Sequence, residues 1–211
     1  MLVVNVNTLD TIIDVRAADS SQRSITGGFV GSLSSEIEFE CVDTDTFTTE
    51  CTFTETKPDQ FPLLEEVGRG SLVLQLPTDI PLAVAFAGES GNATFDMSNT
   101  QLERINLDVN SGDVLVTLPE YAPQSPNAAD EPGRITVGSG DLTVVVPESV
   151  NARLIFDRRG NNTDPEFPPT YIEQRDGVDG VLRRDAETGE FTLNYEIVIP
   201  AGQLRLDTSA Q

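Results

Sequence analysis

The sequence predicts an all-β fold: a single-domain right-handed β-solenoid with coils of about 21 residues and an irregular N-terminal cap. The first observation is a repeat, in which a glycine is followed by apolar residues two, four and six positions later. The second is the regular spacing of these glycines. The third is composition: hydrophobic residues make up 38% of the chain and aromatic residues only 6%, so Val, Leu and Ile must dominate the core. The four copies begin at Gly70, Gly91, Gly112 and Gly140.

Each repeat is predicted to be a strand, a tight turn and a second strand. Successive glycines are 21, 21 and 28 residues apart, and the extra residues fall in a proline-rich segment. Apolar residues also precede the turn, as Leu107 and Val109 precede Gly112, so a strand lies on either side of the glycine. A period of about 21 residues is too short for a four-stranded propeller blade and fits one turn of a β-solenoid.

Stacking of the coils would place equivalent residues in ladders. Parallel strands lie about 4.8 Å apart, so we expect Leu72 beside Ala93, Ala93 beside Val114, and Val114 beside Leu142. Glycine permits the positive φ that a sharp turn needs. The predicted turn glycines are Gly70, Gly91, Gly112, Gly140 and Gly202, the last from a fifth, C-terminal copy of the template.

One domain is expected over residues 1–211. Residues 1–66 match the template poorly and are predicted to form an atypical N-terminal cap, because the open end of a solenoid needs a more polar covering unit. Regular coils are expected over 67–156, an inserted loop over 157–194, and a final coil with a polar tail over 195–211.

The only two cysteines, Cys41 and Cys51, fall on one face of two adjacent predicted strands. A disulfide between them would stabilise the hairpin by about 2–3 kcal/mol in an oxidising compartment. Two reduced, buried thiols in a cytosolic protein are the alternative.

Charge and hydropathy narrow the range of partners. The formal net charge is −22, which repels nucleic-acid phosphate, so we expect no nucleic-acid partner. No run of 18 apolar residues occurs, so we expect no direct membrane insertion. Because the chain begins within a strand pattern, at Val4 and Val6, we expect a signal or anchor segment upstream of it.

Two runs around the turn glycines carry a family resemblance: NLDVNSGDVLVTLP over residues 106–119 and GSGDLTVVVP over residues 138–147. At these residues the chain resembles a bacterial β-strand-repeat family known as putative adhesins, which is related to the toast-rack-like envelope domains. The resemblance covers residues 67–156 and 195–206. It implies a solenoid in an extracytoplasmic setting, often joined to a membrane anchor, with no known catalysis.

The residue types present offer little catalytic chemistry. Histidine is absent, which removes Ser-His-Asp and Cys-His arrangements and the usual zinc ligands. Asp113 and Asp141, each directly after a turn glycine, could serve as a carboxylate pair in a carbohydrate-active enzyme on a β-helix scaffold. The more conservative interpretation is that each aspartate caps its own turn. We therefore expect no enzyme and keep the carbohydrate-active enzyme as the alternative.

No cofactor is expected, and calcium is the one ion for which the loops offer paired oxygen ligands. These pairs are Asp43 with Asp45 and Asp176 with Asp179. Neither pair fits the EF-hand pattern or the nonapeptide calcium repeat.

Two aperiodic segments, Glu120–Gly133 and Asp157–Glu190, are the predicted binding surfaces, because loops carry function where packing fixes the strands. The expected ligand is a protein or a glycan at the cell surface, bound by a non-catalytic, adhesin-like module of the cell envelope. The candidate binding residues in these loops are Tyr121, Arg158, Arg159, Phe167 and Tyr171.

Overall fold

The computed structural model describes residues 1–19, 23–31, 35–57, 69–121, 123, 132–176, 179–184 and 193–209. Within these ranges the protein has sixteen strands and no helix, so the all-β prediction is confirmed. No helix in the described part is therefore long and apolar enough to cross a membrane. The strands are β1 (Leu2–Ala17), β2 (Thr26–Val30), β3 (Glu36–Asp45), β4 (Thr48–Thr56), β5 (Gly70–Leu76), β6 (Pro81–Ser90), β7 (Ala93–Asp96), β8 (Gln101–Ser111), β9 (Val114–Thr117), β10 (Gly133–Ser139), β11 (Leu142–Pro147), β12 (Ala152–Asp157), β13 (Tyr171–Asp176), β14 (Asp179–Arg184), β15 (Leu193–Val198) and β16 (Leu204–Ser209).

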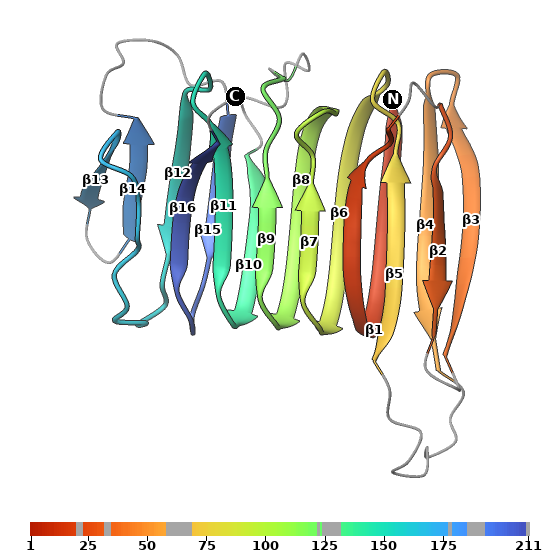
Figure 1. Cartoon of the computed structure of the whole chain (residues 1–211), viewed down its shortest axis with the longest axis horizontal. Helices are drawn as coiled ribbons and strands as arrows, with labels where there is room; N and C mark the ends of the chain where they lie inside the picture. Colours follow the sequence, from red (N-terminus) through yellow and green to blue (C-terminus); the bar gives the residue numbers. More distant parts are fainter. Residues whose placement is uncertain are drawn as a thin grey trace.

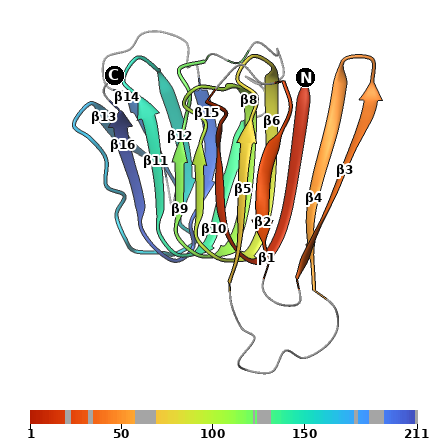
Figure 2. The same ribbon diagram turned by 45° about the vertical axis from the view of Figure 1, so that its right-hand side comes forward.

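The strands form one curled sheet whose two halves face each other as layers (Figure 1). Layer A has the order β13-β14-β12-β15-β10-β8-β6-β1-β4-β3, and layer B has the order β2-β5-β1-β7-β9-β11-β16. Pairing is parallel along the stack and antiparallel only near its ends, in β2–β5, β3–β4, β12–β14 and β13–β14. Figure 2 shows layer A curving outward at β4 and β3.

The N-terminal strand β1 lies inside the stack, third from one end in each layer, and belongs to both layers. Its first half pairs with β4 and β6 in layer A, and its second half pairs with β5 and β7 in layer B. Ile13 of β1 therefore lies between Leu72 and Ala93. The prediction that Leu72 and Ala93 are direct neighbours is wrong. Residues 2–17, assigned from the sequence to an end cap, are instead an internal coil of the stack.

The C-terminal strands also depart from sequential stacking. β15 lies between β10 and β12 in layer A, and β16 lies beside β11 in layer B. The segment expected as an inserted loop contains the hairpin β13–β14, which extends layer A beyond β12.

The core is a single cluster of aliphatic side chains between the layers. Inward residues alternate with outward ones along each strand, as in β11, where Leu142, Val144 and Val146 are fully buried. The predicted rungs Ala93, Val114 and Leu142 do lie beside one another, and Leu204 continues the row. Burying such a side chain contributes about 1.5–3 kcal/mol, so the two-residue alternation is the main source of stability.

Four glycines form a turn ladder at one edge of the stack. Their φ angles lie between +121° and +135°, a region that disfavours any residue with a Cβ. A Cβ on Gly112 would overlap the carbonyl oxygen of Gly91, and one on Gly140 would overlap that of Gly112. Gly70 is different, because it lacks a positive φ and begins β5 opposite Thr11, so its assignment as a turn glycine is wrong. The ladder consists of Gly91, Gly112, Gly140 and Gly202.

Replacing a ladder glycine should destabilise the whole stack. We expect Gly112→Ala to lower the free energy of unfolding by about 3 kcal/mol, because it combines a strained φ with a backbone overlap. Urea unfolding followed by circular dichroism measures the change. The control is Gly28→Ala on β2, where an added Cβ meets nothing within 4 Å; equal effects of the two substitutions would contradict this account of the ladder.

Candidate binding groove on the outer face of layer A

A groove crosses the outer face of layer A above β6. It is made of two adjoining hollows, of about 530 Å³ and 410 Å³, which we call the first and the second hollow. The first hollow is lined by Asn5, Asn7, Thr52, Ala85, Phe86, Ala87, Asn106, Leu107, Asp108, Arg134 and Thr136.

The strand register explains why the groove lies above β6. Asn5, Ala85 and Asn106 occupy one outward row across β1, β6 and β8, and the next row has Asn7, Ala87 and Asp108. Each row therefore has a methyl group between two longer polar side chains. Because strands fix these positions through backbone pairing, the floor and both walls are held in place without loops.

The second hollow continues the groove toward the edge that carries the glycine ladder. It shares Asn7, Ala87 and Asp108 with the first hollow. Three carboxylates line it, and its described lining contains neither Lys nor Arg. Its remaining lining residues are Thr8, Leu9, Thr54, Glu55, Gly88, Glu89 and Asn110.

The two sides of the groove differ in charge. Outward arginines follow one side on β8, β10 and β12, at Arg104, Arg134 and Arg153. Arg134 lies 3.6 Å from Glu196, and both side chains are about half exposed, so the pair contributes little to stability and leaves the guanidinium accessible. On the other side, Glu50 accepts a 2.6 Å hydrogen bond from Asn5.

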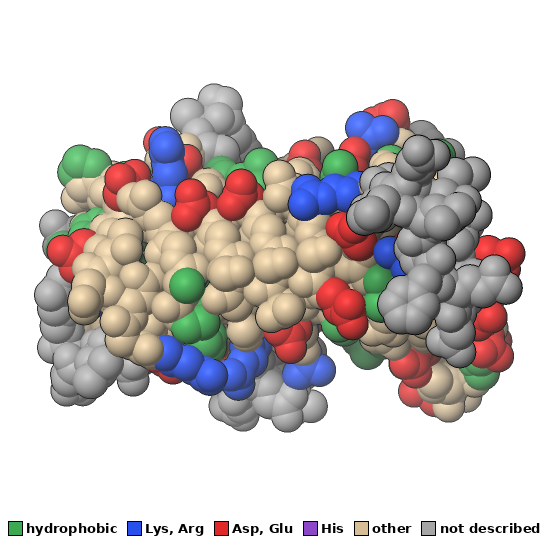
Figure 3. Space-filling model, turned by 90° about the horizontal axis from the view of Figure 1, so that it is seen from below, with side chains coloured by type: hydrophobic (Ala, Val, Ile, Leu, Met, Phe, Trp, Pro, Cys, Tyr) green, Lys and Arg blue, Asp and Glu red, His purple; other side chains and the backbone are tan. Residues whose placement is uncertain are grey.

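The space-filling view supports this description. Seen from below, blue side chains gather along the lower edge, which is the layer A side of the molecule (Figure 3). The same edge is indented between the body of the stack and the part at the β3–β4 end.

The residues proposed from the sequence as a loop site do not lie in this groove. Tyr121 donates a 2.7 Å hydrogen bond to Glu103, and burial together with that carboxylate raises the pKa of Tyr121 to about 12. Arg158 bonds to Asp164 and lies over the Phe156 ring, and Arg159 pairs with Asp157. Phe167 packs against the core, and Tyr171 is buried. Of the segment Glu120–Gly133, residues 122 and 124–131 lie outside the described residues.

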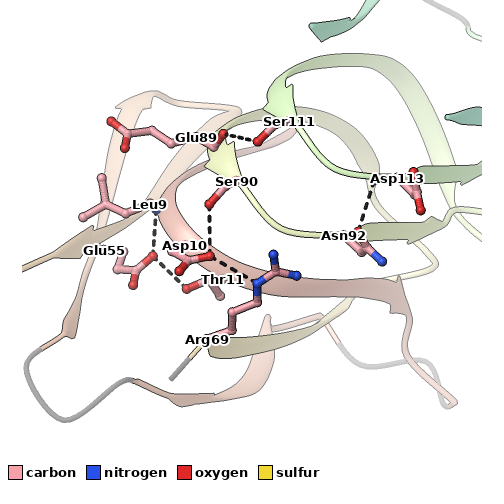
Figure 4. A network of polar contacts seen from close by, with 10 residues as sticks. All are labelled: Leu9, Asp10, Thr11, Glu55, Arg69, Glu89, Ser90, Asn92, Ser111 and Asp113. Atoms are coloured by element: carbon pink, nitrogen blue, oxygen red, sulfur yellow. Dashed lines mark hydrogen bonds and ion pairs between the residues drawn. The ribbon is translucent and has the colours of Figure 1, made fainter. Parts of the chain in front are cut away.

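The aspartates that follow the turn glycines form hydrogen bonds between neighbouring coils. The amide of Asp113 donates to Asn92, that of Asp141 donates to Asp113, and that of Gln203 donates to Asp141, at 2.9–3.1 Å. Figure 4 shows the first of these bonds. The expectation that each aspartate caps its own turn is therefore corrected: its carboxylate accepts from the neighbouring coil.

The candidate calcium ligands that the structure describes are engaged in a hairpin turn. Asp43 accepts from the Thr49 hydroxyl, and Asp45 accepts from the Phe47 amide, a bond that lowers the pKa of Asp45. The side chains of Asp176 and Asp179 lie outside the described residues. Among the described residues, no group of three or more His, Cys, Asp or Glu side chains is placed to hold a metal ion.

Cys41 and Cys51 are direct cross-strand partners in β3 and β4 and form a disulfide. The neighbouring pair, Phe39 and Phe53, stacks with ring centroids 4.6 Å apart. The hairpin is thus held by a covalent bond and an aromatic contact at neighbouring cross-strand pairs on one face.

Comparison with known proteins identifies a fold and no family. No known family and no curated protein matches the sequence. The structure is similar to the crystal structure of a putative cell adhesion protein from Clostridium sporogenes ATCC 15579, with a TM-score of 0.73 over 99% of this chain and 92% of that one. The two sequences are 15% identical, so the likeness shows a shared fold and specifies no family.

The acceptors Asn92, Asp113 and Asp141, which we call the aspartate ladder, lead to a prediction about stability. Asp141→Ala removes the acceptor for the Gln203 amide and should lower the free energy of unfolding by about 1 kcal/mol. The control is Asp207→Ala, which breaks only an exposed ion pair with Arg205 and should cost less than about 0.5 kcal/mol. Urea titration compares the two variants, and an Asp141→Ala protein as stable as the parent would show that the ladder does not stabilise the stack.

Proposed function

We propose that the protein is a non-catalytic, adhesin-like module of the extracytoplasmic cell envelope that binds a glycan in the groove over β6. The observation that carries this proposal is the pair of polar rows on rigid parallel strands with alanine between them. The fold similarity to a putative cell adhesion protein is consistent with it.

The chemistry of the first hollow suits a ligand rich in hydroxyl groups. Asn offers both a donor and an acceptor, Asp accepts, and Arg donates in a fixed geometry. Asn5, Asn106, Asp108 and Arg134 therefore complement hydroxyls that both donate and accept, while the alanine methyls can contact the apolar face of a sugar ring. The volume of the first hollow lies within the usual range for small-ligand sites.

A carbohydrate-active enzyme on the same scaffold is the alternative. Glycoside hydrolysis uses two carboxyl groups on either side of the scissile bond. Asp108 is the single carboxylate among the described residues that line the first hollow. Asp113 and Asp141 are engaged by backbone amides of the stack, so binding is the function that the groove chemistry favours.

The handedness of the stack and the length of its coils are part of the same proposal. We take the stack to be a right-handed, toast-rack-like solenoid with a basic coil of about 21 residues. The side-chain-to-amide bonds between neighbouring coils join residues that are 21, 28 and 62 apart. These separations are consistent with a basic coil of about 21 residues that is lengthened by an inserted segment in two places.

The groove proposal is tested with an immobilised glycan array. We expect Arg134→Ala to weaken binding of the retained glycan at least tenfold, because it removes a donor at the wall of the groove. Ala87→Trp, which places a ring in the trough, should abolish binding. The matched control is Arg153→Ala, another outward arginine in layer A that lies outside the lining of both hollows. Equal losses in Arg134→Ala and Arg153→Ala would contradict the groove, and cleavage of the bound glycan would favour the enzyme.

The location is tested through the disulfide. A Cys41–Cys51 bond persists in oxidising compartments and is rare in the cytosol. Protein taken from its native cells under conditions that block thiol exchange should therefore take up no alkylating reagent until it is reduced. Alkylation of both cysteines before reduction would contradict the extracytoplasmic assignment.

A further inference from the structure

Two arginines lie directly opposite each other on neighbouring strands, near the end of layer A that is remote from β3 (Figure 1). Arg153 of β12 and Arg183 of β14 are cross-strand partners in an antiparallel pair, so both side chains leave the same face of the sheet. That face is the outer one, because the next residues along the strands, Leu154 and Leu182, are fully buried in the core. Like charges in directly opposite positions destabilise a sheet, so this pair needs an explanation.

Neither guanidinium has a counter-ion among the described residues. Nη1 of Arg153 donates to the side-chain oxygen of Asn194 at 3.3 Å, which is a neutral partner. Arg183 makes no hydrogen bond or ion pair within the described part of the chain, and its Nε atom is buried without an acceptor. Both side chains are partly buried. A partly buried charge without a partner costs free energy that a fully solvated arginine does not.

Two carboxylates of the outer face lie near this pair, and other arginines engage both of them. Glu196 of β15 lies one outward row farther along the strands and pairs with Arg134. Asp157 lies two outward rows beyond Arg153 on β12 and pairs with Arg159. The positive charge of the two opposed arginines is therefore left for a group from outside the described structure.

The neighbouring positions add a donor and apolar surroundings. Asn194, Arg153 and Arg183 occupy one outward row across β15, β12 and β14, which we call the donor row. Because the oxygen of Asn194 accepts from Arg153, its amide nitrogen remains available as a further donor. The adjacent outward row has Ile155 and Val181 on β12 and β14. Apolar neighbours lower the local dielectric, which strengthens an ionic hydrogen bond formed beside them.

A phosphate group matches the donor row in charge and in hydrogen bonding. A phosphate monoester carries a charge of about −1.5 to −2 at neutral pH and has three strong acceptor oxygens. Each guanidinium presents its donors in a planar fork that can bind two oxygens of such a group. A carboxylate has a single negative charge and would neutralise only one of the two arginines.

We propose that the donor row is a binding site for a dianionic phosphate group. The site is separate from the groove, because neither Arg153 nor Arg183 lines either hollow and β15 lies between β12 and β10. The inference therefore does not rest on the glycan-binding function. Loss of Arg153 should remove phosphate binding and leave glycan binding in place, so the two sites can fail independently.

The test is calorimetric titration of the full 211-residue chain with inorganic phosphate at about pH 8, in parallel with acetate at the same ionic strength. We expect phosphate to bind at least tenfold more tightly than acetate. Arg153→Gln and Arg183→Gln should each weaken phosphate binding at least tenfold, because each removes one charged fork. The matched control is Arg205→Gln on β16, which loses an exposed arginine paired with Asp207 and should stay within twofold of the parent.

A titration with glycerol 3-phosphate identifies the source of the phosphate group. Binding of this ester at least as tightly as inorganic phosphate would assign the site to a phosphate carried by a larger molecule. Tighter binding of inorganic phosphate would assign it to the free ion. Both results support an oxyanion site at the donor row.

Urea unfolding separates binding from folding. A ligand that binds only the folded state stabilises it, so saturating phosphate should raise the urea midpoint of the parent and of Arg205→Gln but not that of Arg183→Gln. Without phosphate, Arg183→Gln should unfold at a midpoint no lower than that of the parent, because it removes the repulsion between the opposed arginines.

Three results would overturn the assignment, whatever the glycan array shows. The first is absence of phosphate binding to the parent at millimolar concentrations. The second is acetate binding as tight as phosphate binding. The third is phosphate binding that survives in both Arg153→Gln and Arg183→Gln, or that falls equally in Arg205→Gln.

Discussion

Backbone contact between neighbouring coils at the glycine turns is the constraint on which the rest of the structure depends. At this edge a carbonyl of one coil lies where a Cβ of the next would be, so the coils can approach only through glycine. The amide bonds of Gly91, Gly112 and Gly140 to the following coil, at 2.9–3.1 Å, and the aspartate ladder beside them set the register of both layers. A one-residue slip would exchange every inward side chain for an outward one.

The same register produces the groove. The inward positions of β1, β6 and β8 are fixed by the aliphatic core, so the outward positions are fixed as well. Alanines on β6 between polar residues on β1 and β8 then make a trough that requires no loop. Toward the glycine edge the trough continues into the second hollow, which shares Asn7, Ala87 and Asp108 with the first.

The sequence predicted the all-β class and the rungs from Ala93 to Leu142, because a glycine with alternating apolar residues is a strong local signal. It did not predict the place of β1, which has Thr11 where the ladder has glycine and runs through both layers as one strand. Nor could it predict that β15 would return between β10 and β12, since the order of coils in space is a long-range property.

The sequence predicted the binding site in the loops, where the repeat is interrupted and the composition changes. The groove is instead lined by outward strand residues, which in the sequence look like ordinary solvated positions. One signal for it was present: the Ala-x-Ala at the outward positions Ala85 and Ala87 of β6. A crystal structure of the protein with the glycan retained on the array tests the central claim most directly. The account predicts sugar rings above Ala85 and Ala87. Sugar bound elsewhere on the molecule, with the face over β6 empty, would contradict it.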